Sequence, residues 1–193
     1  LHRYMPNAGL ADVRAVIAES LSPECKVELS ANDVVMVCGA AGGLNITLKT
    51  LLDPGDEVII FAPYFVEYLF YADNHGGKAV AVPTLDDFRL NFEALQNALN
   101  EKTKAVIINS PNNPTGVLYS RQELQELARV LKAHSDKRGK AVYLISDDPY
   151  QKITFDGVEA PNIMEFYQDS IYVTSHSKDI ALPGERIGFV AVR

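Results

Sequence analysis

A lysine flanked by hydroxyl side chains and followed by an arginine comes directly after a segment that favours a β-strand. Residues 171–174 are apolar or β-branched, and they predict a strand that runs into a polar turn at Ser175. Lys178 follows this strand at its carboxyl end, where parallel α/β sheets place their ligands. Nearby hydroxyls and a second cation, Arg186, can destabilise the ammonium form and leave a nucleophilic amine. The segment predicts a lysine that forms a Schiff base; the simpler alternative is a solvated lysine in a loop.

A second candidate segment, Gly39-Ala40-Ala41, lies between an expected strand at 33–38 and an expected helix. Small residues let an anion approach the backbone, and the first turn of a helix offers free N–H groups and the positive end of the helix dipole. The segment does not match the GxGxxG pattern, so it gives poor support for a dinucleotide site. It predicts either an anion site or only a tight turn between strand and helix.

Two more polar segments follow expected strands. Residues 110–116, Ser-Pro-Asn-Asn-Pro-Thr-Gly, are dense in proline and glycine and predict a rigid turn. Asp147 and Asp148 follow the strand expected at 141–146. Two adjacent acids could hold a metal ion, but no histidine or further acid is placed to complete such a site. We therefore predict no metal site.

These segments must be positioned by a series of apolar strands that alternate with helices. Uninterrupted apolar strands, rather than strands with alternating polarity, are typical of a mostly parallel sheet covered on both faces. A stripe of Leu10, Val13, Ile17 and Leu21 predicts the buried face of the first helix, and residues 134–140 are expected to form a charged loop. The expected strands are 33–38, 57–62, 78–82, 104–109, 141–146, 171–174 and 187–192, and the expected helices are 9–21, 44–52, 65–74, one capped by Asn91 and one that begins with the capping box at 120–123.

The composition limits the class of protein. The chain has 193 residues, 47% of them apolar, and a net charge of −7, which disfavours nucleic acid or an anionic membrane as a partner. The two cysteines, Cys25 and Cys38, form no disulfide framework; we expect both to be buried and the protein to be cytoplasmic. The chain has no initiator methionine and ends within an apparent strand at Arg193, so we expect a piece of a longer protein.

The segment Ser175-His176-Ser177-Lys178, followed by Gly-Glu-Arg-Ile-Gly at 184–188, resembles the lysine segment of fold-type I, pyridoxal-phosphate-dependent aminotransferases of the aspartate aminotransferase class. The Asn-Pro-Thr-Gly string at 113–116 is also similar to a loop of that family. The resemblance covers nearly the whole chain. It implies a three-layer α/β/α large domain over 1–193, with a mostly parallel seven-stranded sheet in which 187–192 is antiparallel. It also implies that the family's N-terminal arm and C-terminal small domain are absent.

The resemblance implies a role for residues around the ring of pyridoxal phosphate. Lys178 would hold the cofactor as a Schiff base. Asp147 would pair with the pyridinium nitrogen, so that the ring can act as an electron sink. Asn113 and Tyr150 would donate hydrogen bonds to the phenolic oxygen. Phe65 would stack on the ring, with Tyr64 as a less favoured substitute, although aromatic residues after a strand are otherwise expected in the core.

The resemblance also implies a phosphate site made of backbone amides, hydroxyls and one guanidinium. Tyr4 would reach the phosphate of the neighbouring subunit's cofactor, which implies a homodimer with shared active sites. The other members of this site would be Gly39, Ala40, Ala41, Ser175, Ser177 and Arg186.

Two positions depart from the family's pattern. The family often has a hydroxyl residue in the turn at 39–41, where this chain has two alanines. Asp148 stands where the family often has glutamate, and we expect a structural role for it. His176, between the two serines, is expected to pack rather than to catalyse.

The function implied by the resemblance is transfer of an amino group between an L-amino acid and a 2-oxo acid. Two alternatives remain open. The same site serves β-lyases and related enzymes that use pyridoxal phosphate, and some bacterial transcription regulators carry an aminotransferase-like effector domain. The sequence does not indicate which amino acid or oxo acid would be used.

Overall fold

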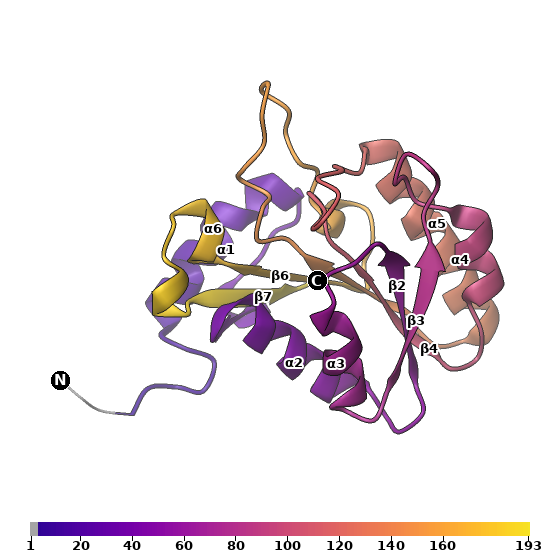
Figure 1. Ribbon diagram of the computed structural model, residues 1–193. Coiled ribbons are helices and arrows are strands. Elements are labelled where there is room, and N and C mark those ends of the chain that lie inside the picture. Colours follow the sequence, from indigo (N-terminus) through magenta and orange to yellow (C-terminus); the bar gives the residue numbers. More distant parts are fainter. Residues whose placement is uncertain (1–3) are drawn as a thin grey trace.

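A central sheet of seven strands runs through the part of the chain that the computed structural model describes, residues 4–193 (Figure 1). The strands are β1 (Val34–Val37), β2 (Glu57–Ala62), β3 (Lys78–Pro83), β4 (Thr103–Ile108), β5 (Tyr143–Asp147), β6 (Ser170–Ser175) and β7 (Gly188–Val192). The α-helices are α1 (Ala11–Cys25), α2 (Gly39–Leu51), α3 (Glu67–Asp73), α4 (Phe92–Ala98), α5 (Arg121–Arg138) and α6 (His176–Asp179), and the 3-10 helices are η1 (Ala31–Asp33), η2 (Ile163–Glu165) and η3 (Pro183–Glu185).

The strand order is β1-β7-β6-β5-β4-β2-β3. Strand β7 is antiparallel to both of its neighbours, while β6, β5, β4, β2 and β3 pair in parallel. The predicted fold, a mostly parallel seven-stranded sheet with the last strand antiparallel, is therefore confirmed. Because β4, β5 and β6 are parallel neighbours, the polar segments that follow them meet at one edge of the sheet.

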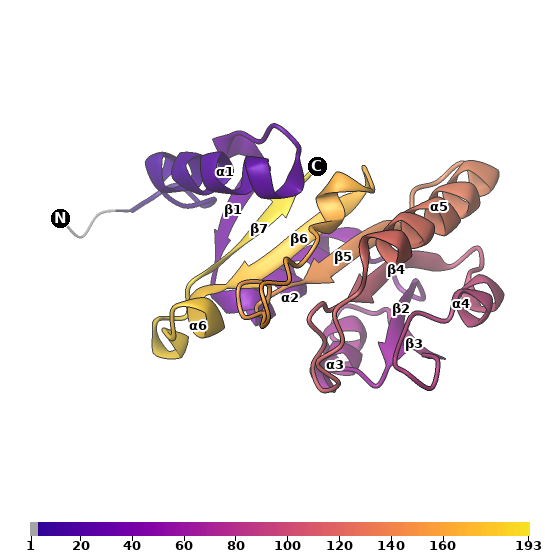
Figure 2. The ribbon, with the colours of Figure 1, turned by 90° about the horizontal axis from the view of Figure 1, so that it is seen from above.

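Successive residues of each strand enter two separate hydrophobic cores. Ile59 packs in the core beneath α1, α4 and α5, and its neighbour Ile60 packs in the core beneath α2 and α3. Figure 2 shows the two groups of helices on opposite sides of the sheet. The strands are apolar on both faces for this reason, as the absence of polar alternation in the sequence predicts.

Helix α5 has the clearest end signals in the sequence. The Ser120 hydroxyl accepts a hydrogen bond from the Glu123 backbone N–H at 3.3 Å, and the Glu123 carboxylate accepts one from the Ser120 N–H at 2.9 Å. The helix ends at Gly139, which adopts a φ of 68°. The prediction of a loop at 134–140 is wrong, because residues up to Arg138 form the last turns of this helix.

The first helix and one cysteine also differ from expectation. Helix α1 buries Ala18, Leu21 and Cys25, whereas Leu10 and Val13 are exposed. The predicted stripe was therefore wrong at its first two positions, because the helix begins only at Ala11 and contacts the sheet with its second half. Cys25 is buried as expected, but Cys38 is exposed at the turn before α2.

Candidate active site

Ten of the residues proposed from the sequence surround one cavity of about 390 Å³ at the carboxyl edge of the sheet. They come from segments as far apart as α2 and the chain after β6, so only the fold brings them together. Cavities of this size commonly hold small-molecule ligands. The ten residues are Ala40, Ala41, Phe65, Asn113, Asp147, Tyr150, Ser175, Ser177, Lys178 and Arg186.

Lys178 lies on α6, the single helical turn that follows β6. Its Nζ is 5.9 Å from the centroid of the Tyr150 ring. The His176 ring nitrogen Nδ1 lies 2.9 Å from Asp179 Oδ2, which ties the two ends of α6 together. The His176 backbone N–H also donates to Ile187 O at 3.0 Å. His176 therefore fixes the turn that carries the lysine, in line with the packing role expected for it.

Asp147 is the buried acid of the cavity. Its Oδ2 accepts a 2.6 Å hydrogen bond from the Tyr68 hydroxyl, and its backbone carbonyl accepts one from the Asn109 side-chain amide at 2.5 Å. Burial raises the pKa of Asp147 to about 6, and the Tyr68 hydrogen bond offsets part of the shift. Its other oxygen, Oδ1, is buried without a hydrogen-bond partner among the described residues.

The unpaired Asp147 Oδ1 indicates whether this cavity suits pyridoxal phosphate. A buried carboxylate oxygen without a partner is costly, and a cationic N–H donor would satisfy it. The pyridinium nitrogen is such a donor. The donor set of the cavity, a primary amine, a guanidinium, two serine hydroxyls and helix N–H groups, also suits an aldehyde that carries a phosphate. The residues present therefore fit the cofactor that the resemblance implies.

The 109–116 loop is held rigidly between β4 and α5. The Asn109 side-chain oxygen accepts the backbone N–H of Asn113 at 2.6 Å. The Asn112 side-chain oxygen accepts both the backbone N–H of Thr115 at 3.2 Å and its hydroxyl at 2.9 Å. Asn109 thus contacts both the loop and Asp147, so it fixes Asn113 relative to the buried acid. The Asn113 and Tyr150 side chains both line the cavity.

The start of α2 and the chain after η3 form the cationic end of the cavity. Gly39 has a φ of +70°, and a Cβ built there would lie 2.9 Å from Nη2 of Arg186. A side chain at position 39 would therefore displace the guanidinium. The N–H groups in the first turn of α2 have no carbonyl partner within the helix. Ser175 and Ser177 line the same cavity, so amides, hydroxyls and a guanidinium converge as expected for an anion site.

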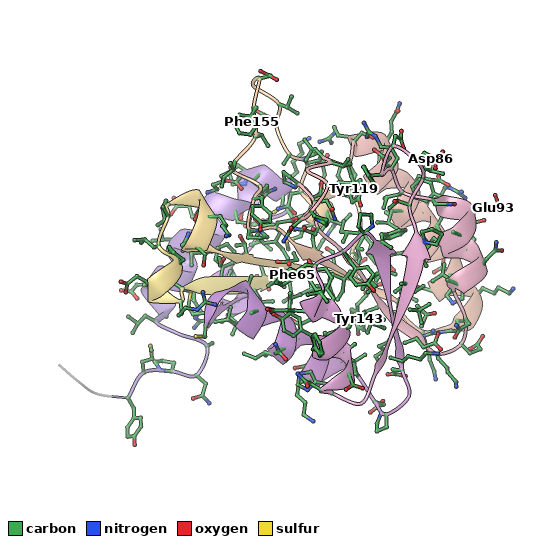
Figure 3. All side chains as sticks on the ribbon, viewed as in Figure 1. Phe65, Asp86, Glu93, Tyr119, Tyr143 and Phe155 are labelled. Carbon is green, nitrogen blue, oxygen red and sulfur yellow. The ribbon has the colours of Figure 1, made fainter. Side chains whose placement is uncertain are left out.

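Phe65 lies just before α3, at the centre of the view in Figure 3. Its ring meets that of Tyr68 edge to face, with centroids 5.7 Å apart. Phe65 is thereby fixed in the wall of the cavity.

The sequence reasoning missed four residues of the cavity that carry polar groups on their side chains: Tyr68, Asn109, Glu67 and Tyr71. Burial and Asp147 raise the pKa of Tyr68 well above its ordinary value, so its hydroxyl stays a donor. The Tyr71 hydroxyl donates to the Glu67 carboxylate one turn away. The aromatic spacing of 65, 68 and 71 was a signal, but the same spacing is common in helices that pack on a core.

Tyr4 does not line the cavity and is fully exposed. In Figure 1 the chain at this end extends away from the sheet. Within residues 4–193, no group of three or more histidine, cysteine or acidic side chains is arranged to bind a metal ion. None of the helices described is both long and apolar enough to cross a membrane.

Comparison with known proteins gives a consistent result. A family model described as "Aminotransferase class I and II" matches residues 1–193. The aspartate aminotransferase of Pyrococcus abyssi is 38% identical over 99% of the chain and 49% of its own length, and that of Bacillus subtilis is 35% identical over 98% and 48%. The chain thus spans about half the length of the curated relatives it matches.

Solved structures give the same picture. The crystal structure of an aminotransferase from Eubacterium rectale superposes with a TM-score of 0.97 at 38% identity, over all of this chain and 49% of that one. Aspartate aminotransferase from Thermus thermophilus with maleate superposes with a TM-score of 0.91 at 32% identity, over 98% of this chain and 49% of that one.

Proposed function

Because this chain belongs to the family of class I and II aminotransferases, we propose that the full-length protein carrying it transfers an amino group between an L-amino acid and a 2-oxo acid, with pyridoxal phosphate bound at Lys178. One observation carries the proposal. A single cavity contains an amine, a buried carboxylate with a free oxygen, and a guanidinium beside a helix N-terminus. These are the three groups that an aldehyde, a pyridinium nitrogen and a phosphate require.

In this proposal each end of the cavity binds one part of the cofactor. Arg186, the serine hydroxyls and the first amides of α2 bind the phosphate. Asp147 accepts the ring N–H on its free Oδ1, while Tyr68 holds its other oxygen. Asn113 and Tyr150 donate to the phenolic oxygen, and Phe65 orients the ring. When bound, the cofactor supplies an aldehyde that condenses with amines and a cationic ring that accepts electrons.

Lys178 has two roles in the proposed reaction. Its Nζ would hold the cofactor covalently. As a free amine, it would act as the general base that removes the proton from the α-carbon of the amino acid. Burial and Asp147 raise the pKa of the nearby Tyr150 hydroxyl, which therefore remains a hydrogen-bond donor at neutral pH.

We further propose a homodimer with shared active sites in the cytoplasm. The full exposure of Tyr4 supports a role for this residue outside its own subunit's cavity, at the phosphate of the neighbouring cofactor. Ile46, Val66 and Phe70 are also exposed, on α2 and at α3 next to the cavity, and would be covered by a second subunit. The two free cysteines support a reducing compartment.

The proposal is tested by incubating the full-length protein and pyridoxal phosphate with a panel of L-amino acids and 2-oxoglutarate, beside Lys178→Ala. We expect the wild type to form glutamate and the matching 2-oxo acid in equal amounts, and the variant to form neither. Release of ammonia and pyruvate without glutamate would identify a lyase instead. Cofactor binding without turnover of any amino acid would favour the regulator alternative.

A further inference from the structure

Two adjacent acids at the end of β5 face opposite sides of the sheet. Asp147 lines the cofactor cavity. Asp148 lines a second, smaller cavity of about 90 Å³, which we call the rear pocket; its wall also includes Thr174, His176 and Tyr172. The side chains at the end of β6 and in the turn after it alternate in the same way. Thr174 and His176 line the rear pocket, whereas Ser175 and Ser177 line the cofactor cavity. The strand ends that hold the proposed cofactor are thus the wall between two cavities.

Asp148 joins three segments of this wall. Its Oδ2 accepts the Ser146 hydroxyl at 2.6 Å. Its backbone N–H donates to Val173 O at 2.8 Å, and its carbonyl accepts the Thr174 hydroxyl at 2.9 Å, so it ties the end of β5 to β6. The Ser110 backbone amide, near the start of the 109–116 loop, is close enough to Asp148 to lower the pKa of its carboxyl group, against the larger effect of burial. The residue therefore lies between the segments that carry Asp147, Lys178 and Asn113.

Asp148 as a whole residue is only 4% exposed, and its Oδ1 has no hydrogen-bond partner among the described residues. Burial, reinforced by the charge of Asp147, raises the pKa of Asp148 to about 8. A neutral carboxylic acid carries an O–H group in place of the negative charge, so it avoids a buried charge at the unpaired oxygen. An ionised group there would be a buried charge with an unpaired oxygen, next to a second carboxylate.

We propose that Asp148 is a positioning residue: as a neutral acid it holds the ends of β5 and β6 and the 109–116 loop in the arrangement that binds the cofactor ring. This inference rests on the proposed function. Ionisation of Asp148 strains the wall and places a second negative charge behind Asp147. The titratable and charged groups that face Asp148 from α1, α3, β5, β6, α6 and the segment after β5 are Glu24, Tyr68, Asp147, Tyr172, His176, Asp179 and Lys152.

The test is the dissociation constant of pyridoxal phosphate, measured by absorbance or fluorescence between pH 7 and 9, for the full-length wild type, Asp148→Asn and Asp148→Ala. Asparagine keeps the size and a donor but cannot ionise, so the two proteins differ in whether position 148 can carry a charge. The ratio of the wild-type to the Asp148→Asn dissociation constant should rise about tenfold from pH 7 to pH 9. Asp148→Ala should bind about tenfold more weakly than Asp148→Asn at pH 7.

The matched control is Asp136→Asn, which changes an acid of α5 whose side chain is 64% exposed, and which should follow the wild type at every pH. A ratio that stays constant from pH 7 to 9 would overturn the proposal, even if Asp148→Ala proves too unstable to measure. A loss of thermal stability in the variants without any change in this ratio would reduce Asp148 to a structural residue. No cofactor binding by the wild type at any pH would instead refute the proposed function, and this inference with it.

Discussion

At the scale of single residues, the site depends on how one buried carboxylate is divided between two partners. Tyr68 donates to Asp147 Oδ2 at 2.6 Å, and Oδ1 is unpaired and is the oxygen proposed to bind the cofactor. The Tyr68 hydrogen bond favours the ionised acid and so lowers the pKa that burial has raised to about 6. Tyrosine is suited to this role because its own pKa lies well above neutrality, so it cannot exchange its proton with the acid.

Tyr68→Phe should therefore raise the pKa of Asp147. Since the ionised acid is the form that binds the pyridinium, cofactor affinity falls as pH drops through this pKa. Removing a hydrogen bond to a charged group costs about 1.5 kcal/mol. The pH below which cofactor affinity falls should therefore rise by about one unit. The measurement is the cofactor dissociation constant from pH 5 to 8. If affinity falls at the same pH in the variant and the wild type, Tyr68 does not set the pKa of Asp147.

The resemblance to a known family implied the roles of Lys178, Asp147 and Asn113, and each of them lies in a polar segment that follows an expected strand. Because parallel strands bring their carboxyl ends to one edge of the sheet, the fold brings these three residues to one cavity. Tyr68 was missed because its side chain is apolar except at one atom, and it sits at helical spacing where a core residue is expected. The contact of its hydroxyl with Asp147, 79 positions along the chain, depends on the tertiary fold alone.

At the scale of elements, α2 must approach the sheet closely to place its first turn at the cavity. A Cβ built on Gly43 would lie 2.8 Å from Val173 Cγ1 and 3.0 Å from Val190 Cγ2. The helix therefore rests on β6 and β7 with its backbone.

Gly43→Ala should force α2 away from the sheet. We expect a loss of about 1–3 kcal/mol in the free energy of unfolding and weaker cofactor binding, because overpacking is relieved only by backbone shifts. The neighbouring Gly42→Ala is the matched control, since its Cβ would meet only Cys38 Cβ at 3.4 Å. It should be neutral or stabilising by up to about 1 kcal/mol. Equal effects of the two variants, in urea unfolding and cofactor titration, would contradict this account.

Most elements could be predicted because the apolar strands and the capping signals are local. The β2 bounds, Glu57–Ala62, agree with the expected strand, and the capping box at Ser120 begins α5 as expected. The end of α5 was missed because its last turns are polar, and neither burial nor periodicity distinguishes a solvated helix end from a loop. Helix α1 was misjudged for the opposite reason: Leu10 and Val13 are apolar but exposed, since no described element covers them.

At the scale of the whole molecule, the two buried acids make stability depend on pH. The folded pKa values of Asp147 and Asp148, about 6 and about 8, lie above the ordinary value of 3.8. The folded state therefore holds protons that the unfolded state has released, and stability falls as pH rises from about 4 to about 8. Each acid lowers the free energy of unfolding by at most about 1.4 kcal/mol per pH unit.

In the cofactor-free, full-length protein, the decrease in the free energy of unfolding between pH 6 and 8 should come mainly from Asp148. The decrease should be smaller in Asp148→Asn. Urea unfolding at pH 5, 6, 7 and 8 measures the free energy of unfolding of both proteins. Wild-type and variant curves that run parallel between pH 6 and 8 would show that Asp148 is already ionised in the folded protein.

The proposed dimer makes a prediction about the exposed apolar side chains at α3. Phe70 is 59% exposed beside the cavity, and a second subunit would cover it. Phe70→Ser should weaken self-association at least tenfold in sedimentation equilibrium, because burying a phenyl group contributes about 1.5–3 kcal/mol. Val16→Ser, at a similarly exposed site on α1, is the control and should leave the association unchanged. A monomeric wild type, or equal effects of the two substitutions, would refute the proposed interface.

The central claim is that Lys178 is the residue that binds the cofactor covalently, and it can be tested directly. The full-length protein is incubated with pyridoxal phosphate and reduced with borohydride, and its peptides are examined by mass spectrometry. We predict one stoichiometric modification, on Lys178, that is absent from Lys178→Ala and from protein reduced before the cofactor is added. Modification spread over exposed lysines such as Lys132 and Lys152, or a Lys178→Ala protein labelled as fully as the wild type, would contradict the account.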